Sequence, residues 1–110
     1  MQIGNRSIGG DAEPFIIAEI GINHGGDLET AKQMVKLVAS SGGECVKHQT
    51  HILEDEMTED AKKIIPPNAS ISIWEIMEEC LLTLSEEEKL KTYAESLGLI
   101  YMSTPFSRKA

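Results

Sequence analysis

The sequence predicts an α/β protein whose strands form a parallel sheet. Three short segments near residues 15–21, 44–50 and 99–104 have the composition of buried strands, and segments of helical periodicity separate them. Strands without strict alternation are typical of parallel sheets covered by helices. Two architectures fit this order, an open doubly wound sheet and the first part of a (β/α)8 barrel. A barrel needs about 250 residues, so this chain of 110 residues would supply only its first three strands.

The first strand and the helix that follows it have clear boundary signals. Residues 1–13 are polar and turn-rich, and Pro14 precedes the apolar run 15–21 that we expect to be a strand. After a loop at 23–26, Asp27 is a favourable N-cap. Gly42-Gly43 predicts the helix end, since glycine adopts the left-handed cap conformation readily. Helical spacing on one face is shown by Leu28, Ala31, Val35, Val38 and Ala39.

The second half of the chain predicts two strands joined by a long connection and helices. After the strand at 44–50, we expect a solvated acidic loop at 54–56 and a short helix near 58–65 before Pro66-Pro67. Two Ser-x-x-Glu capping boxes, at Ser72 and Ser85, predict helices near 73–82 and 86–96. Pro105 interrupts the last strand, at 99–104. The buried stripe predicted for the second helix consists of Leu90, Tyr93, Ala94 and Leu97.

The charge balance excludes several kinds of partner. Ten Lys and Arg residues against 18 Asp and Glu give a net charge of −8, which disfavours nucleic acid and anionic membranes. No apolar run approaches the roughly 20 residues of a membrane-spanning helix, and the amino terminus lacks a signal-peptide pattern. Cys45 and Cys80 lie in apolar segments, which predicts buried free thiols in a reducing cytoplasm.

Polar residues near the carboxyl ends of the strands are the candidate functional groups. Glu19 interrupts an apolar strand, where an unpaired carboxylate is costly, so it is either functional or paired with a neighbouring lysine. Lys47 and Gln49 share one strand face, and His48 and Thr50 share the other. Lys47 offers a cation for a phosphate or carboxylate; the alternative is a solvated lysine at the sheet edge.

The remaining motifs give weaker indications of a functional site. His48 and His51 do not fall on one strand face, which favours packing or loop-anchoring histidines over a metal site. The hydroxyls at 104–107 suit either a phosphate or a helix N-cap at Ser107. The glycines match neither a dinucleotide-binding nor a Walker-type loop. The pattern alone therefore indicates a small-molecule α/β enzyme or a piece of one.

Six segments resemble the sialic acid synthases, which condense phosphoenolpyruvate with an N-acylated amino sugar. The resemblance spans residues 3–110 and departs from the family at Pro67, where glycine is usual, and Trp74, where tyrosine is usual. The pair His48 and His51 resembles the N-acetylneuraminate-making branch more than the pseudaminate-making branch. The matching segments are Ile17-Ala18-Glu19-Ile20-Gly21-Ile22-Asn23-His24 with Gly26-Asp27-Leu28, and the ranges 46–51, 54–57, 65–69, 72–77 and 103–108.

The resemblance implies a fold and a domain organisation. Residues 1–110 would be the β-α-β-α-β portion of a (β/α)8 TIM barrel, truncated after strand 3. The remaining strands and a small C-terminal antifreeze-like domain would be absent, and the full-length enzyme would be a swapped homodimer.

The resemblance also implies a site and a mechanism. Lys47 and Thr104 would bind phosphoenolpyruvate, while the sugar side would be lined by Glu19, Gln49, Asn68 and Phe106; Glu19 and Lys47 would be catalytic. A manganese or magnesium ion would activate the aldehyde of N-acetylmannosamine or a related sugar. Its two histidine ligands are expected downstream of Ala110, so this chain alone would bind no metal.

Two other hypotheses stay open. Lys47 fits a Schiff-base nucleophile of a barrel aldolase if its amine is uncharged. Alternatively, the 110-residue chain is a non-catalytic fragment, inactive because the metal ligands are missing. Three parallel strands of a barrel leave two unpaired edges, and we expect such a fragment to associate through them.

Overall fold

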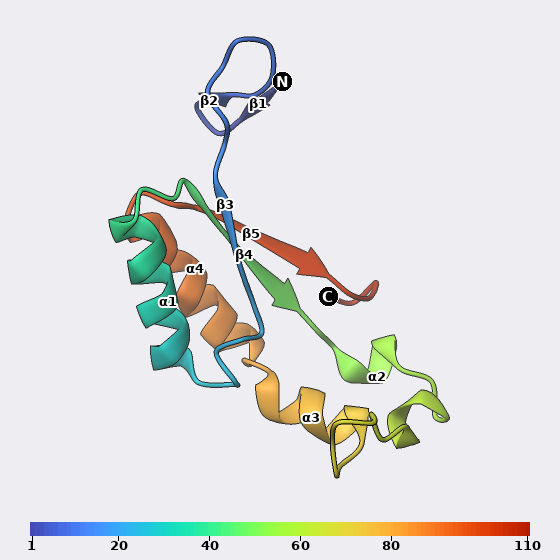
Figure 1. The fold of residues 1–110 in the computed structure, drawn as a ribbon. Coiled ribbons are helices and arrows are strands. Elements are labelled where there is room, and N and C mark those ends of the chain that lie inside the picture. Colours follow the sequence, from blue (N-terminus) through green and yellow to red (C-terminus); the bar gives the residue numbers. More distant parts are fainter.

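In the computed structural model, which describes all of residues 1–110, a three-stranded parallel sheet organises the chain (Figure 1). The strands are β3 (Ile17–Gly21), β4 (Cys45–Thr50) and β5 (Ile100–Pro105), and they lie side by side in chain order. All pairs are parallel, with a register shift in β3 between Glu19 and Gly21. The α/β class predicted from the sequence is confirmed.

Two helices cover one face of this sheet. Helices α1 (Leu28–Ser40) and α4 (Leu84–Ser96) lie next to each other on the same side (Figure 1). The Asp27 side chain caps α1, and Gly42, with φ of +82°, follows its last turn, as the sequence predicts. The helices and strands share one buried cluster, which consists of Ile20, Ala31, Val35, Val46, Leu82, Leu90, Ala94 and Leu99.

Two details of α4 differ from the prediction. The capping box is formed by Thr83 and Glu86, so the helix begins earlier than a box at Ser85 would allow. Leu82 is buried in the core, and this fixes Thr83 as the boundary residue. The predicted burial of Leu97 is wrong, since this residue is 38% exposed. Leu97 is the C-cap residue of α4, where helical spacing no longer sets the direction of the side chain.

The connection between β4 and α4 differs from the prediction in the position and length of its helical segments. The acidic loop expected at 54–56 is instead helical, within α2 (Leu53–Glu56), whose first residue is buried. The short helix expected near 58–65 is a single 3-10 turn, η1 (Ala61–Lys63). Helix α3 (Ile73–Cys80) begins with the predicted box of Ser72 and Glu75.

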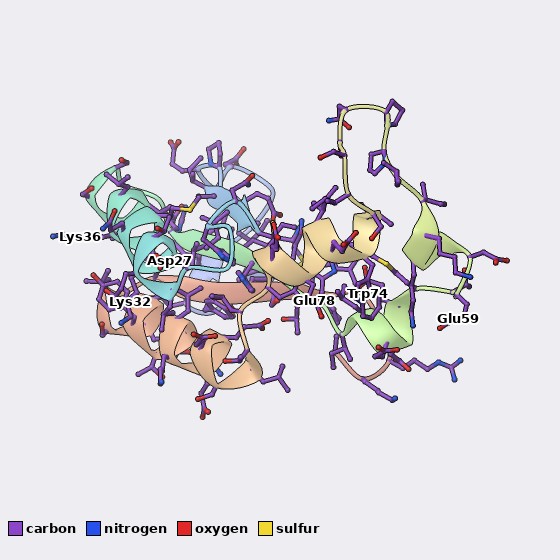
Figure 2. All side chains as sticks on the ribbon, turned by 90° about the horizontal axis from the view of Figure 1, so that it is seen from below. Asp27, Lys32, Lys36, Glu59, Trp74 and Glu78 are labelled. Carbon is purple, nitrogen blue, oxygen red and sulfur yellow. The ribbon has the colours of Figure 1, made fainter.

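Lys62 makes contacts with several parts of the connection between β4 and α4. Its Nζ atom lies 2.9 Å from Glu54 and 2.7 Å from Glu59, and 4.5 Å from the centroid of the Trp74 ring. Trp74 lies on the part of α3 that faces the connection (Figure 2). Lys62 therefore links two carboxylates of the connection to one aromatic ring of α3.

The polar first residues form a hairpin that the sequence did not predict. Strands β1 (Gln2–Ile3) and β2 (Arg6–Ser7) pair antiparallel, and the hairpin lies beyond the amino ends of the sheet strands (Figure 1). The Arg6 guanidinium donates to the Glu44 carboxylate just before β4, which lowers the pKa of Glu44. The hairpin therefore lies opposite the carboxyl ends of the strands.

The remaining predictions concern thiols and membranes. Both cysteines are free, with Cys45 fully buried and Cys80 half-buried. None of the helices combines the length and hydropathy needed to cross a bilayer.

Candidate active site at the carboxyl ends of the strands

The sheet face turned away from the helices brings four predicted site residues together. Glu19 pairs with Lys47 in the strand register, and Gln49 pairs with Thr104. Lys47 and Gln49 are partly exposed, whereas His48 and Thr50, on the other face, are buried. The predicted two-residue alternation of β4 is thus confirmed. The four side chains lie on this open face, with Glu19 and Lys47 near the middle of β3 and β4 and Gln49 and Thr104 toward the carboxyl ends of β4 and β5.

Glu19 and Lys47 form an ion pair on the open face. The Lys47 Nζ atom lies 2.7 Å from Glu19 Oε2, and the two side chains are 34% and 44% exposed. At such exposure, solvent screens the pair, so it contributes little to the stability of the fold. The pair instead presents a cation and a carboxylate side by side, within reach of a ligand.

A second group of contacts surrounds Gln49. The His51 Nε2 atom lies 3.1 Å from Gln49 Oε1, while Nδ1 lies 2.8 Å from Glu56 Oε2. The His51 ring stacks on Phe106, with 4.1 Å between the ring centroids. Phe106 follows β5 and its backbone N–H donates to the Thr50 carbonyl. His51 therefore joins the ends of β4 and β5 to α2.

Glu56 was missed by the sequence analysis. It was expected in a solvated acidic loop, but α2 turns it toward His51, and its side chain is only 16% exposed. The two residues are five positions apart, a separation with no fixed geometry in irregular structure. No local pattern signals this pair.

Asn68 does not join the strand residues. It is exposed in a turn closed by a hydrogen bond from the Ala69 N–H to the Pro66 carbonyl, beside α3. Its side chain makes no hydrogen bond with Glu19, Lys47 or Gln49. Of the six predicted site residues, Asn68 is the one that the structure leaves apart.

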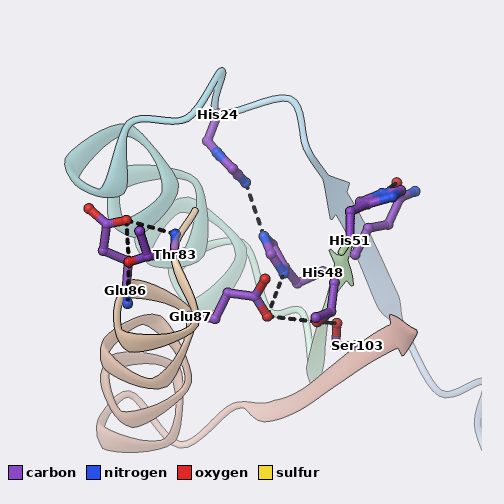
Figure 3. A network of polar contacts seen from close by, with 9 residues as sticks. His24, His48, His51, Thr83, Glu86, Glu87 and Ser103 are labelled. Atoms are coloured by element: carbon purple, nitrogen blue, oxygen red, sulfur yellow. Dashed lines mark hydrogen bonds and ion pairs between the residues drawn. The ribbon is translucent and has the colours of Figure 1, made fainter. Parts of the chain in front are cut away.

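The helix side of the sheet holds a buried polar network that the sequence analysis did not foresee (Figure 3). The Ser103 hydroxyl lies 2.7 Å from that of Thr50, and Thr50 donates to Glu87 of α4 over 2.6 Å. The Nε2 atoms of His24 and His48 are 3.0 Å apart, and the two rings stack. The network ties the loop after β3, strands β4 and β5, and helix α4 together.

The hydrogen bonds of this network fix the tautomers of the neutral histidines. His24 Nδ1 accepts from the Gly26 N–H, so its proton is on Nε2, which donates to His48 Nε2. His48 then carries its proton on Nδ1, which faces Glu87 Oε2 at 3.8 Å. The sequence predicts a packing histidine at position 48, and the burial of its ring confirms this prediction.

Burial controls the charges of these groups. Desolvation lowers the pKa of His48 to about 4, and the neighbouring His24 adds to this effect. The pKa of His24 is also lowered by burial, whereas burial raises the pKa of Glu87. The network therefore favours neutral rings at neutral pH.

The residues of this chain do not form a recognisable cation site. No group of three or more His, Cys, Asp or Glu side chains lies close enough to hold a metal ion. Glu19, the carboxylate on the open face, is already paired with Lys47. The donors present on this face suit an anionic or hydroxylated organic ligand rather than a divalent metal.

Known proteins are similar to this chain in both sequence and fold. The family model described as the NeuB family matches residues 34–110. The N,N'-diacetyllegionaminic acid synthase of Legionella pneumophila is 38% identical over 97% of this chain and 31% of its own length. The human N-acetylneuraminate-9-phosphate synthase is 32% identical over 96% of this chain and 30% of its own length.

A solved structure extends the similarity to three dimensions. The N-acetylneuraminic acid (sialic acid) synthetase of Leptospira borgpetersenii superposes with a TM-score of 0.78 at 28% identity, over 99% of this chain and 35% of its own. The chain thus spans about 30% of the length of the curated relatives it matches.

Proposed function

Because the chain belongs to the NeuB family, we propose that residues 1–110 form part of a larger synthase. This enzyme joins phosphoenolpyruvate to N-acetylmannosamine or a related N-acylated amino sugar, giving a nonulosonic acid and phosphate. The observation that carries the proposal is the ion pair of Glu19 and Lys47 beside Gln49 and Thr104. Gln49 and Thr104 lie toward the carboxyl ends of parallel strands, where α/β enzymes bind their substrates, and the ion pair lies beside them on the same face.

The larger enzyme is proposed to be a (β/α)8 barrel with a C-terminal antifreeze-like domain, assembled as a homodimer. The strand order β3-β4-β5 and the placement of α1 and α4 on one face support this arrangement. In a doubly wound sheet the order reverses and helices cover both faces. The outer edges of β3 and β5 have no strand partner, as expected of a barrel segment.

Lys47 is proposed to bind the phosphate or carboxylate of phosphoenolpyruvate. In a protein of net charge −8, a local cation is needed to offset the unfavourable field on a trianionic substrate. Glu19 holds this cation in place at 2.7 Å without enclosing it. The Thr104 hydroxyl, one strand away, is proposed to donate to the same substrate.

The amino sugar is proposed to bind beside this anion site. Gln49 offers amide donors and an acceptor, and Phe106 offers an apolar face that is 45% exposed. Glu19 is proposed to orient the sugar or to exchange a proton with its aldehyde oxygen. Asn68 is proposed to line the sugar side on the family resemblance alone.

The reaction forms a carbon–carbon bond. The methylene carbon of phosphoenolpyruvate attacks the aldehyde carbon of the open-chain sugar, water adds at the former enol carbon, and phosphate leaves as its carbon–oxygen bond breaks. A manganese or magnesium ion is proposed to act as the Lewis acid. Since the side chains of this chain do not fit such an ion, its ligands are proposed to lie on later strands.

A second candidate function uses Lys47 as a Schiff-base nucleophile. This chemistry requires an uncharged amine that attacks a carbonyl carbon, whereas the Lys47 Nζ atom lies 2.7 Å from the Glu19 carboxylate in an ion pair. Borohydride in the presence of the substrate traps a Schiff base as a mass increase on Lys47. We expect no such adduct.

Phosphate release tests the proposed condensation directly. The longer protein that contains this chain is incubated with phosphoenolpyruvate and N-acetylmannosamine, and phosphate and nonulosonic acid are quantified. Lys47→Ala is expected to raise the KM for phosphoenolpyruvate at least about tenfold, the loss of one charged hydrogen bond. The control Lys91→Ala, on the exposed surface of α4, is expected to be unchanged.

Two results would overturn the proposal. The first is an absence of phosphate release with every N-acylated amino sugar tested, and the second is an unchanged KM in Lys47→Ala. The 110-residue chain alone is expected to be inactive. Turnover by the purified chain would show that no further strands are needed.

A further inference from the structure

His51 is buried at the point where the candidate sugar side meets α2. Its side chain is only 3% exposed, and three different groups surround the ring: the Gln49 amide, the Glu56 carboxylate and the Phe106 ring. Gln49 lies on β4, whereas Phe106 directly follows β5. One imidazole thus contacts two of the residues that the proposed function assigns to the sugar.

The ring holds one end of the Gln49 amide. A carboxylate only accepts, so His51 Nδ1 donates to Glu56, at 2.8 Å and 3.1 Å from its two oxygens. Nε2 then faces Gln49 Oε1 at 3.1 Å.

The other end of the amide is left for a ligand. Gln49 Nε2 lies 3.3 Å from where a Cβ of Gly21 would be, so the glycine leaves room for the amide beside β3. With its oxygen 3.1 Å from His51 Nε2, Gln49 has its NH2 group beside Gly21 of β3. An NH2 group recognises an acceptor oxygen, such as the acyl carbonyl or a hydroxyl oxygen of an amino sugar.

We propose that His51 is a positioning residue that fixes Gln49 and Phe106 for the amino sugar, and that Glu56 in turn fixes His51. This inference rests on the proposed function, since it assigns a role within the same site. His51 does not touch the reacting atoms. It acts by holding one amide orientation and one ring position, so that less ordering is needed when the sugar binds.

Steady-state kinetics of the longer protein separates positioning from mere folding. His51→Phe keeps a ring against Phe106 but loses both hydrogen bonds, and the KM for the amino sugar is expected to rise about tenfold. His51→Gln returns a donor to the Nε2 position and is expected to recover most of this loss. The KM for phosphoenolpyruvate is expected to change less than about twofold.

Two matched variants on α2 test whether Glu56 positions His51. Glu56→Gln removes the carboxylate that holds the ring and is expected to raise the KM for the amino sugar severalfold. Glu54→Gln is the control, because Glu54 lies on the same helix with a side chain that is 71% exposed and contacts Lys62 instead. An amino-sugar KM unchanged in His51→Phe, or an equal rise in both substrates' KM values, would overturn the inference.

The contact between His51 and Gln49 can also be tested by NMR, without any enzymatic turnover. The Gln49 side-chain amide, assigned by its loss in Gln49→Glu, is observed by 1H–15N NMR in the wild type and in His51→Phe. A clear shift of this signal in His51→Phe, with the signal unmoved in Glu54→Gln, supports the contact. If the wild type shows no condensation, the proposed function fails, while an unmoved amide signal overturns the positioning role. If His51→Phe does not fold, the KM for the amino sugar and the NMR signal of the Gln49 amide are measured in Glu56→Gln instead. Values unchanged from the wild type would then overturn the inference.

Discussion

Lowering the pH from 7 to 5 is expected to destabilise the protein through His48. The ring is 1% exposed, and its folded pKa is about 4, against 6.5 for the ordinary side chain. Between these two values the unfolded chain binds a proton that the folded chain rejects. Stability from this group is therefore complete above pH 6.5 and falls as the pH is lowered toward 4.

The size of the effect follows from the two pKa values. The full difference corresponds to about 3 kcal/mol, and about 2 kcal/mol of it falls between pH 7 and pH 5. Small domains are stable by only about 5–15 kcal/mol, so the loss is measurable. His24, whose pKa is also lowered by burial, acts in the same direction.

Other groups that face the ring are present in both the wild type and a His48 variant. The pKa of Glu87 is raised, so protonation of this carboxyl stabilises the fold as the pH falls and partly offsets His48. Tyr101, stacked on the other side, does not titrate in this range because its pKa is raised further by burial. The comparison with His48→Phe therefore isolates the histidine.

Urea denaturation followed by the fluorescence of Trp74, the single tryptophan, gives the free energy of unfolding at each pH. The wild type is expected to lose about 2 kcal/mol more than His48→Phe between pH 7 and pH 5. Equal losses, within about 0.5 kcal/mol, would refute the reasoning. If the variant does not fold, an NMR titration of the His48 ring decides, and protonation above pH 5.5 would contradict the buried neutral state.

Three further predictions concern the free energy of unfolding from urea denaturation. Gly26→Ala is expected to cost more than about 3 kcal/mol, since φ is +76° and its Cβ would lie 2.4 Å from a backbone carbonyl oxygen in α3. Gly25→Ala, with φ of +59° and open space around it, is expected to cost about 1 kcal/mol, and equal costs would contradict the clash. Thr83→Ala is expected to cost about 1 kcal/mol and Ser85→Ala less than half of that, because Thr83 is the N-cap of α4. A larger cost for Ser85→Ala would instead favour the capping box at Ser85 that the sequence predicts. Leu90→Ala, at a fully buried position, is expected to cost about 2–5 kcal/mol, and a loss below 1 kcal/mol would contradict a packed core.

The order of the elements could be predicted because its signals are local. The strand–helix alternation, the cap at Asp27 and the glycine after α1 depend on residues within one or two turns of each other. The alternation of β4 likewise follows from its two-residue period, which separated Lys47 and Gln49 from His48. The family resemblance then narrowed the chemistry further than any pattern did.

Signals that compete locally were resolved only by packing. Thr83 and Ser85 both begin a Ser/Thr-x-x-Glu pattern, and the burial of Leu82 decides between them. The segment after His51 has an acidic composition typical of a loop, yet the buried Leu53 turns it into α2. In both cases, a core contact outweighed the local preference.

The sequence by itself determined the fold class and the open face of β4, because periodicity and capping act over a few residues. Its polar strand residues suggested Glu19, Lys47 and Gln49 as candidates, whereas Asn68 and Phe106 rest on the family resemblance. Only the tertiary structure decided which side chains meet. Glu19 pairs with Lys47 from the next strand, and Thr50 bonds with Glu87, 37 positions away. It also left Asn68 apart in an exposed turn. Such contacts depend on strand register and helix placement, which are set by burial of the whole core rather than by any short segment.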